Sequence, residues 1–270
     1  MTTDAIRKLD RLHETLAATG GVVVAYSGGS DSTLVAAVAA RTLGDRALAI
    51  TAVSPSLAPG EAEEARRVAA ELGIAHRTVR TREAERPEYL ANGTDRCYHC
   101  KTELYDVLAS VAAEAELSVV MSGANVDDLG DFRPGLVAAA EHGVRHPLIE
   151  VAMTKSDVRE AARELALSTW DKPASACLAS RIPFGVTIKV EELSKVGRAE
   201  RLLKDLGFAQ CRVRVHGDVA RIEVDVADVQ RLAAPGVRQS VVESLHALGY
   251  RYVTLDLEGF RSGSMNPESS

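Results

Sequence analysis

Residues 25–32 (AYSGGSDS) combine glycine, serine and aspartate in a pattern suited to binding phosphate. They follow an apolar run and precede a helical pattern, which predicts a strand–loop–helix corner. The glycines allow the backbone to approach a ligand, and the N–H groups of the first helical turn point into the loop. The alternative is a turn that only caps the helix. The pattern favours a phosphate-binding loop whose nucleotide ligands are Ala25, Ser27, Gly28, Gly29, Asp31 and Ser32.

Cysteines provide a second chemical signal. Cys97 and Cys100 form a C-x-x-C pair at a predicted loop-to-helix junction, and Cys177 lies in a long loop near Lys172 and Arg181. Two thiolates at this spacing bind one metal or cluster, or act as a redox dithiol. A second C-x-x-C pair is absent, so the pair predicts an incomplete site that needs another ligand. Cys177 is either a small buried hydrophobe or, beside cations, a nucleophile or ligand.

Acidic residues follow another predicted strand. Gly123 ends the strand, and Asn125, Asp127 and Asp128 come directly after it. Carboxylates beside a nucleotide commonly hold Mg²⁺, which screens the charge of a triphosphate. The alternative is a solvated loop with Asx turns. We expect Gly123, Asn125 and Asp127 to bind the nucleotide, and Asp127 and Asp128 to bind Mg²⁺.

Two arginines form a further candidate site near the C-terminus. Arg212 and Arg214 alternate along a predicted strand, so their side chains project from one face. Such a pair binds phosphate through bidentate hydrogen bonds. The alternative is a surface pair that faces Glu223 or Asp225 on the neighbouring strand. Glu200 and Glu223 are themselves expected to be surface acids rather than metal ligands.

The elements that must position these residues alternate between strands and helices. This order predicts an α/β fold with a doubly wound parallel sheet. Ligands of such sheets bind at the carboxyl ends of the strands, where the phosphate-binding loop and the Gly123 loop are both expected. The predicted strands are 22–25, 47–53, 75–79 and 119–121, and the predicted helices include 4–18, 59–73 and 154–165, the last capped by Thr154.

The pattern changes near Thr187. A helix, a β-hairpin that turns at residues 216–218, a second helix and a strand predict a smaller α+β domain. Cys211 lies in a strand of this domain with no reactive neighbour, so we expect it in the core. The sequence therefore predicts two domains, 1–186 and 187–270. The elements expected in the second are helices 190–206 and 237–247 and strands 211–216, 219–225 and 250–255.

Composition restricts the classes of protein that fit. The 270 residues are 46% hydrophobic and 26% charged, with a net charge of −6. This acidic balance argues against a nucleic-acid partner. No apolar run reaches the roughly 18–20 residues of a membrane span, and no signal-peptide core is visible. We therefore expect a cytoplasmic protein whose cysteines serve metal binding or chemistry rather than disulfides.

The motifs together resemble the LarE family of ATP-dependent sulfur transferases. The first motif alone is similar to the signature of the PP-loop ATP pyrophosphatases, and the remaining motifs narrow the resemblance to LarE. It covers nearly the whole chain and implies the PP-loop, adenine-nucleotide α-hydrolase-like fold, with adenine on the backbone near Val53. The narrowing motifs are residues 96–101 (RCYHCK), 123–128 (GANVDD), 131–135 (DFRPG), 170–174 (WDKPA), 177–183 (CLASRIP) and 259–266 (GFRSGSMN).

The resemblance also implies a substrate and a reaction. The substrate is pyridinium-3,5-dicarboxylate mononucleotide, a precursor of the nickel-pincer nucleotide cofactor of lactate racemase. One of its carboxylates attacks the α-phosphate of ATP, which gives an acyl-adenylate and pyrophosphate. Sulfur then displaces AMP and leaves a thiocarboxylate. The family's substrate site matches Arg212 and Arg214, with Arg181, and the resemblance implies a homo-oligomer.

The LarE family divides on its source of sulfur. Some members sacrifice one cysteine at the position of Cys177, which becomes dehydroalanine. Others carry three cysteines, thought to hold a 4Fe-4S cluster with a labile sulfide. The presence of Cys97, Cys100 and Cys177 favours the cluster type, with ATP and Mg²⁺ as further cofactors and sulfide or a sulfur-donating protein as supplier. A tRNA thiolase and a zinc-stabilised nucleotide-binding protein stay open as alternatives.

Overall fold

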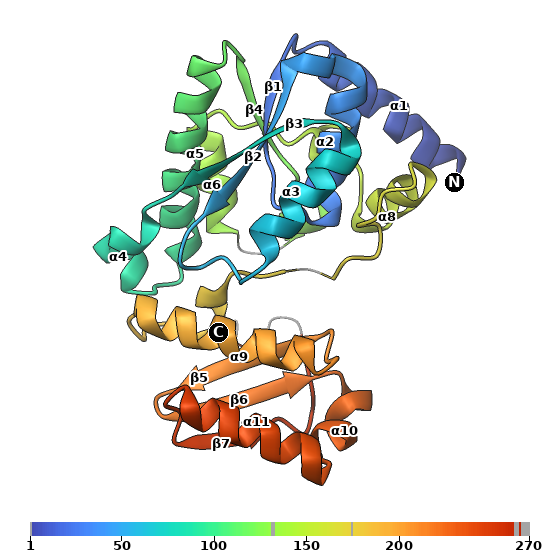
Figure 1. Cartoon of the computed structure of the whole chain (residues 1–270). Coiled ribbons are helices and arrows are strands. Elements are labelled where there is room, and N and C mark those ends of the chain that lie inside the picture. Colours follow the sequence, from blue (N-terminus) through green and yellow to red (C-terminus); the bar gives the residue numbers. More distant parts are fainter. Residues whose placement is uncertain (1, 131–132, 174, 262–264, 266–270) are drawn as a thin grey trace. The chain divides into compact units, whose positions relative to one another are not determined.

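The structure, a computed structural model, describes residues 2–130, 133–173, 175–261 and 265 and divides into two compact units (Figure 1). Unit 1 comprises Met1–Ser54, Gly60–Arg86 and Asp95–Ser175, and unit 2 comprises Pro55–Pro59, Pro87–Thr94 and Ala176–Ser270. Compact units need not fold independently, so the domain boundary at residues 186 and 187 stays a prediction. Asp131, Phe132, Ala174 and most of the closing motif lie outside the described residues.

Unit 1 is built on a parallel sheet of four strands in the order β3-β2-β1-β4. β1 (Val22–Ala25) lies between β2 (Ala47–Val53) and β4 (Val119–Ser122), and β3 (Ala75–Arg80) forms the edge beyond β2. The chain moves outward from β1 to β3 and then returns to the other side of β1. This order confirms the predicted doubly wound fold. It also places the reversal of strand order, where such sheets bind ligands, between β1 and β4.

Helices cover both faces of this sheet (Figure 1). Strand side chains alternate between the two cores, with Val22 and Val24 in one and Val23 in the other. α1 (Thr3–Ala17), α2 (Ser30–Leu43), α3 (Glu61–Leu72), α7 (Pro147–Glu150) and α8 (Lys155–Glu164) contribute to the first core, and α5 (Arg96–Glu114) and α6 (Pro134–Glu141) to the second. The short elements η1 (Gly44–Arg46), η2 (Glu83–Glu85) and η3 (Val126–Gly130) connect them.

The helix termini in unit 1 follow local chemistry. Thr154 caps α8 by accepting a hydrogen bond from the N–H of Asp157, and the Asp157 carboxylate accepts one from the N–H of Thr154. This reciprocal cap confirms the predicted helix start. The helix predicted from residue 59 begins later, at Glu61, because Gly60 adopts the left-handed conformation with φ of 87°. A residue in that conformation cannot belong to a right-handed helix.

Unit 2 contains a sheet of three strands in the order β5-β6-β7. β5 (Cys211–His216) and β6 (Val219–Val224) form the predicted antiparallel hairpin, and β7 (Tyr252–Leu255) pairs in parallel with β6. Cys211 is fully buried, and burial raises the pKa of its thiol to about 12, which confirms it as a core residue. The helical elements of this α+β unit are α4 (Pro87–Leu90), η4 (Leu178–Arg181), α9 (Val190–Asp205), η5 (Val226–Asp228), α10 (Val229–Ala233) and α11 (Pro235–Ala247).

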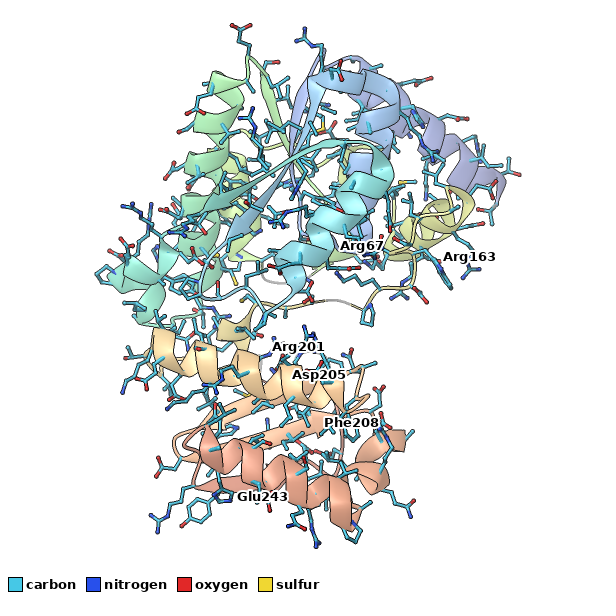
Figure 2. All side chains as sticks on the ribbon, in the orientation of Figure 1. Arg67, Arg163, Arg201, Asp205, Phe208 and Glu243 are labelled. Atoms are coloured by element: carbon cyan, nitrogen blue, oxygen red, sulfur yellow. The ribbon has the colours of Figure 1, made fainter. Side chains whose placement is uncertain are left out.

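The outer faces of the helices are polar (Figure 2). On α9, for example, Arg201 and Asp205 form an exposed ion pair at 2.9 Å between Nε and Oδ1. Exposed pairs at this spacing contribute little to stability. Each unit is therefore stabilised mainly by the apolar inner faces of its own helices. No helix in the described part of the chain is long and apolar enough to cross a membrane.

Two half-buried histidines in unit 1 make its stability depend on pH. Burial lowers the pKa of His76 and His146 below the ordinary value of 6.5, and the positive charges of Arg66 and Lys101 respectively add to this effect. The unfolded chain therefore binds more protons than the folded chain at mildly acidic pH. It follows that protonation favours unfolding there.

We expect the free energy of unfolding to decrease between about pH 7 and about pH 5.5, a range above the titration of unfolded carboxylates near pH 4. Urea titrations across this range measure the effect. His76→Gln and His146→Gln should each flatten the dependence, and the same change at the exposed His246 controls for the substitution itself. An unchanged slope in both variants would contradict the assignment.

Candidate functional site

The predicted phosphate-binding loop lies between β1 and α2. α2 begins at Ser30, so the unpaired N–H groups of its first turn face the loop. Gly28 adopts φ of 69°, a left-handed conformation that favours glycine. The hydroxyl oxygens of Ser27 and Ser32 lie 3.0 Å apart, and the N–H of Ser27 donates to Ser32 Oγ at 3.2 Å. These contacts preform the loop, in which Ser32 Oγ also donates to the carbonyl oxygen of Gly29 at 3.2 Å.

Gly123, the residue after β4, packs directly against the start of α2. A Cβ atom at this position would lie 2.7 Å from the backbone nitrogen of Ser32 and 2.9 Å from its Cα, a distance that real Cβ atoms essentially never show. Gly28 is similarly close to α3, with a Cβ position 3.0 Å from Cα of Ala65. Gly123 therefore lets the loop after β4 meet the start of α2 where the strand order reverses, and Gly28 lets the loop after β1 approach α3.

Asp31 lies at the centre of a polar network beside the loop. Asn125 Nδ2 donates to Asp31 Oδ1 at 3.1 Å, which joins the loops after β1 and β4. Lys155 Nζ, at the start of α8, forms an ion pair with the other oxygen of Asp31 and donates to Ser30 Oγ at 2.8 Å. The backbone N–H of Lys155 donates to Asp127 Oδ2 at 2.8 Å. The structure thus brings together the predicted residues Asp31, Asn125 and Asp127.

Two lysines contact the loop or its first helical turn, and their local sequence patterns indicate this position for neither of them. Lys155 lies 124 residues from Asp31 along the chain, and its position after a helix cap does not distinguish it from other surface lysines. Lys172 Nζ donates to the carbonyl oxygen of Gly28 and to Glu61 Oε2, both at 3.2 Å. Both ammonium groups bring positive charge to a site predicted to bind phosphate.

Asp127 and Asp128 both take part in hydrogen bonds of their own loop. Asp128 accepts from the N–H of Asn125 at 3.0 Å and pairs with Arg133 at 3.1 Å. This is the Asx-type loop that the alternative interpretation described. Within the described ranges, no three histidine, cysteine, aspartate or glutamate side chains gather into a metal site. The assignment of Mg²⁺ to these two residues stays a prediction.

Cys97 and Cys100 lie in the first turn of α5, which confirms the predicted loop-to-helix junction. Residues three apart lie on the same side of a helix, so both thiols face one direction. Neither forms a disulfide, and Cys97 is exposed whereas Cys100 is half-buried. Next to them, Tyr98 Oη donates to Glu141 on α6 at 2.7 Å, which fixes the start of α5. The pair is therefore an available two-thiol donor set.

Cys177 belongs to unit 2, where it is an exposed free thiol just before η4. The buried Arg181 holds the backbone around it. Arg181 Nη1 donates to the carbonyl oxygens of Ala176 and Cys177 at 2.9 and 3.0 Å, and Nε and Nη2 form a bidentate pair with Glu200 at 2.8 and 2.9 Å. The predicted proximity of Arg181 to Cys177 is therefore a contact with its backbone.

Arg212 and Arg214 are both buried, at 7% and 5% exposure, and lie on the same face of β5. Arg214 forms two hydrogen bonds to Glu223 Oε2 at 3.0 and 2.8 Å and a third to the carbonyl oxygen of Ser180 at 3.1 Å. Burial lowers the pKa of Arg212, and the neighbouring charges of Arg181 and Arg214 lower it further. Three guanidinium groups thus gather in unit 2, where an anion would be stabilised.

The expectation that Glu200 and Glu223 are surface acids is wrong. Their exposed fractions are 3% and 0%. Each carboxylate is buried because it pairs with a buried arginine, Arg181 or Arg214. The alternation of charged and apolar residues around them is also typical of a solvated face, so the sequence pattern does not reveal their burial, although the contact of Arg214 with Glu223 is one that the alternative interpretation named.

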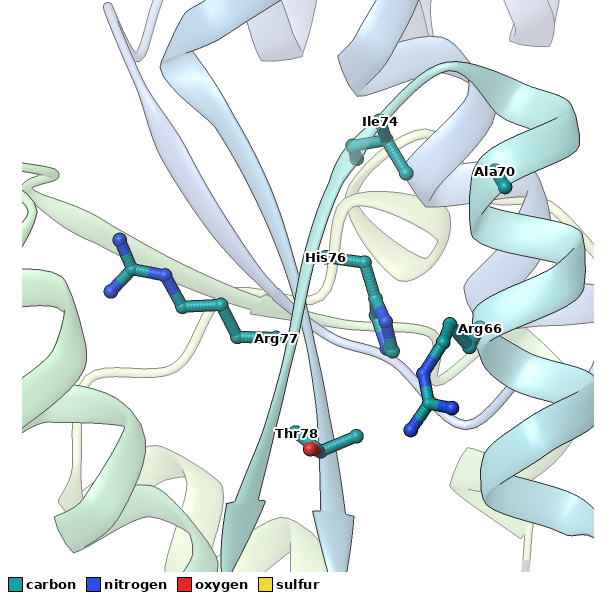
Figure 3. A pocket seen from close by; sticks show the side chains of 6 residues that line it. All are labelled: Arg66, Ala70, Ile74, His76, Arg77 and Thr78. Carbon is teal, nitrogen blue, oxygen red and sulfur yellow. The ribbon is translucent and has the colours of Figure 1, made fainter.

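A pocket between α3 and β3 lies outside the predicted site (Figure 3). Arg66 and Thr78 are directed into it together with His76, whereas Arg77 points to the opposite side of the strand. His76 Nε2 is 2.9 Å from Thr51 Oγ1, which also donates to the carbonyl oxygen of Tyr26. This chain of hydrogen bonds ties the pocket to the residue that precedes the phosphate-binding loop.

Comparisons with known proteins agree with the motifs. Residues 10–129 match the asparagine synthase family. An uncharacterised protein of Synechocystis is 47% identical over 259 residues, 96% of this chain and 97% of that protein. The pyridinium-3,5-bisthiocarboxylic acid mononucleotide synthase of Lactiplantibacillus plantarum is 41% identical over 247 residues, 91% of this chain and 88% of that protein. A tRNA-specific 2-thiouridylase of Azorhizobium caulinodans is 32% identical over 73% of this chain and 58% of its own length.

The close packing of Gly123 predicts the effect of a single methyl group. Gly123→Ala should displace the start of α2 and weaken binding of a non-hydrolysable ATP analogue about tenfold, since overpacking costs about 1–3 kcal/mol. Calorimetric titration measures the dissociation constant. Gly236→Ala is the matched control, because no atom lies within 4 Å of its added Cβ. Equal affinity in the Gly123→Ala and wild-type proteins would show that the contact is not needed.

Proposed function

Because this chain belongs to the LarE family of PP-loop ATP pyrophosphatases, we propose that it uses ATP to convert carboxylates of pyridinium-3,5-dicarboxylate mononucleotide into thiocarboxylates. It is an enzyme of the adenylating, sulfur-transferring kind. The name of the L. plantarum relative specifies a bisthiocarboxylic product, which fits two rounds of the same reaction. The observation that carries the proposal is the preformed phosphate-binding loop, with Lys155 and Asn125 joined to Asp31 beside it.

Activation of the carboxylate is the first step that we assign to this loop. The N–H groups of the first turn of α2, the hydroxyls of Ser27 and Ser32 and the ammonium of Lys155 would bind the departing phosphates, with adenine on the backbone near Val53. A carboxylate oxygen attacks the α-phosphorus, and the bond to the bridging oxygen breaks. Pyrophosphate leaves with the electron pair. Asp127 and Asp128 would hold Mg²⁺, which screens the triphosphate charge.

The substrate's own phosphate is assigned to unit 2. Support comes from the environment of Arg212, whose pKa is lowered first by burial and then by the like charges of Arg181 and Arg214, against the opposing effect of Glu200. A phosphate group would relieve this repulsion and accept bidentate hydrogen bonds. Arg181 already donates to Glu200 and to two carbonyl oxygens, so its contribution to substrate binding is mainly its charge.

Transfer of sulfur is assigned to the cysteines. The thiols of Cys97, Cys100 and Cys177 form no disulfide, and three thiolates suit a 4Fe-4S cluster with one open iron. When bound, such a cluster supplies a labile sulfide. Sulfur attacks the carbonyl carbon of the acyl-adenylate, the bond from that carbon to the AMP oxygen breaks, and AMP leaves with the electron pair. Sulfide or a sulfur-donating protein would restore the sulfur.

A sacrificial reaction of Cys177 is the second candidate, and the exposure of its free thiol favours it. Its thiolate would attack the acyl-adenylate and expel AMP, which leaves a thioester. Loss of the Cα proton would then break the Cβ–S bond and give a thiocarboxylate and dehydroalanine. The similarity to a tRNA thiouridylase leaves tRNA as an alternative substrate, although the net charge of −6 disfavours binding of a nucleic acid.

Product stoichiometry separates the two sulfur sources. After anaerobic reconstitution with iron and sulfide, we expect more than one thiocarboxylate per chain. Cys97→Ala and Cys100→Ala should abolish repeated turnover, since each removes one ligand from an already incomplete donor set. Mass spectrometry of the product and of residue 177 makes both measurements. One product per chain with dehydroalanine at residue 177 would instead support the sacrificial reaction.

The role of Lys155 in activation is tested by removing its charge. Lys155→Met should raise the KM for ATP about tenfold, because a hydrogen bond to a charged group is worth about 1.5–3 kcal/mol. Pyrophosphate release measures this step alone. Lys8→Met is a matched control, because Lys8 pairs with Asp157 of the same helix at 2.8 Å. An equal effect of both substitutions would indicate a general loss of stability.

A further inference from the structure

We propose that the buried Arg181–Glu200 pair is a positioning device that fixes the backbone of Cys177 and thereby the direction and reactivity of its thiol. The proposal rests on the proposed function only in giving Cys177 a part in sulfur transfer. The orientation of the cysteine follows from contacts within unit 2 alone.

Arg181 donates hydrogen bonds to the peptide groups on both sides of the Cys177 Cα. Its Nη1 donates to the carbonyl oxygen of Ala176 at 2.9 Å and to that of Cys177 at 3.0 Å. These oxygens belong to the peptide groups before and after the Cys177 Cα. Since peptide groups are planar, holding both of them limits rotation about the two bonds at that Cα. The backbone of Cys177 is thereby held at φ of −59° and ψ of 152°, which sets the direction of its Cβ and sulfur.

Glu200 fixes Arg181 in turn. Its two oxygens accept from Arg181 Nε and Nη2 at 2.8 and 2.9 Å, and Oε1 also accepts from the N–H of Val213 on β5 at 3.0 Å. The side chains of Arg181 and Glu200 are only 2% and 3% exposed. Removing either partner would leave an unpaired charge in the interior, which is strongly destabilising. The pair is therefore rigid, and it is tied to a strand rather than to another loop.

Further hydrogen bonds restrain the loop around Cys177. The N–H of Leu178 donates to the carbonyl oxygen of Ser56 at 2.8 Å, and Arg214 Nη1 donates to the carbonyl oxygen of Ser180 at 3.1 Å. Ser180 Oγ itself accepts from Arg181 Nη1 at 2.8 Å. The backbone around Cys177 is thus restrained closely although its thiol is exposed. Such restraint suits a residue that must present one atom to a reaction.

Stability alone does not account for this arrangement. A buried ion pair is commonly no more stabilising than well-packed apolar residues of the same volume. Apolar residues have no donors, however, and could not hold two carbonyl oxygens. Lysine would keep the positive charge opposite Glu200, but its single ammonium lacks the planar fork that reaches both the carboxylate and the two carbonyl groups. Arg181→Lys therefore removes the hydrogen bonds to the two carbonyl oxygens and keeps the positive charge opposite Glu200.

The direct test is the reactivity of Cys177 in the folded protein. Iodoacetamide alkylation, followed by peptide mass spectrometry, gives the rates at Cys177 and Cys97 in the same sample. In Arg181→Lys we expect the rate at Cys177 to rise about tenfold and the rate at Cys97 to stay unchanged, since hydrogen bonds from a charged donor to the loop are lost. Glu200→Gln, which keeps the shape of its side chain, serves as a second variant should Arg181→Lys not fold.

Arg231→Lys is the matched control. Arg231 also holds two carbonyl oxygens and a carboxylate: it donates to Leu206 and Gly207 at 3.1 and 3.0 Å and to Asp228 at 2.9 Å. It belongs to the same unit but does not contact the Cys177 loop. We expect this control to lower the melting temperature without changing the alkylation of Cys177. Wild-type alkylation of Cys177 in a folded Arg181→Lys or Glu200→Gln protein would overturn the proposal.

Activity provides a second and independent readout. Sulfur transfer in Arg181→Lys should fall about tenfold in kcat, because the thiol is no longer held in one direction. Pyrophosphate release that depends on the carboxylate substrate reports any loss of substrate binding in the same variant, and the positioning role predicts a smaller fall in this release than in sulfur transfer. If the wild-type protein transfers no sulfur, the proposed function fails, whereas a change in Cys177 alkylation would still support the positioning role. If transfer and pyrophosphate release fall equally, the defect is structural and the positioning role is rejected.

Discussion

The close approach of Gly123 to the first turn of α2 is the constraint on which the nucleotide site depends. The loops after β1 and β4 come from strands almost 100 residues apart, and they meet only because the strand order reverses between them. A side chain at position 123 would occupy the space of the Ser32 backbone. With glycine there, the loop of Asn125 comes near enough to bind Asp31. The polar network around Asp31 therefore depends on the close backbone packing at Gly123.

The same packing also brings partners to the carboxylate of Asp31 beside this loop. A free carboxylate beside a triphosphate would repel it, and Asp31 lies in the first turn of α2, the helix whose N-terminus is predicted to bind phosphate. Its two oxygens are instead taken by Asn125 and Lys155. The pair with Lys155 offsets the negative charge and leaves the helix N-terminus and the hydroxyls to act on an anion. Asp31 therefore orders the site through Asn125 and Lys155, and its contact with the nucleotide stays a prediction.

The sequence predicted best the features that depend on neighbouring residues. Apolar runs located the strands of the parallel sheet, and the glycine–serine pattern located the loop, because both depend on backbone conformation within a few residues. Lys155 was missed and Glu200 and Glu223 were placed wrongly on the surface, because their partners are distant in the chain or on another element. A charged residue has the same local pattern whether it meets water or a buried counter-charge. Only the fold distinguishes the two.

The two units restrain their candidate functional residues by different interactions. The phosphate-binding loop relies on backbone N–H groups and hydroxyls, which are fixed by secondary structure and need no buried charge. Cys177 lies where regular structure gives way to a short helical turn, so secondary structure cannot fix it. Buried guanidinium groups do so instead, each neutralised by a carboxylate within unit 2. Because buried ion pairs are often no more stabilising than apolar packing, their presence here is consistent with the role that we propose for them, which is to hold the backbone of Cys177 in one conformation.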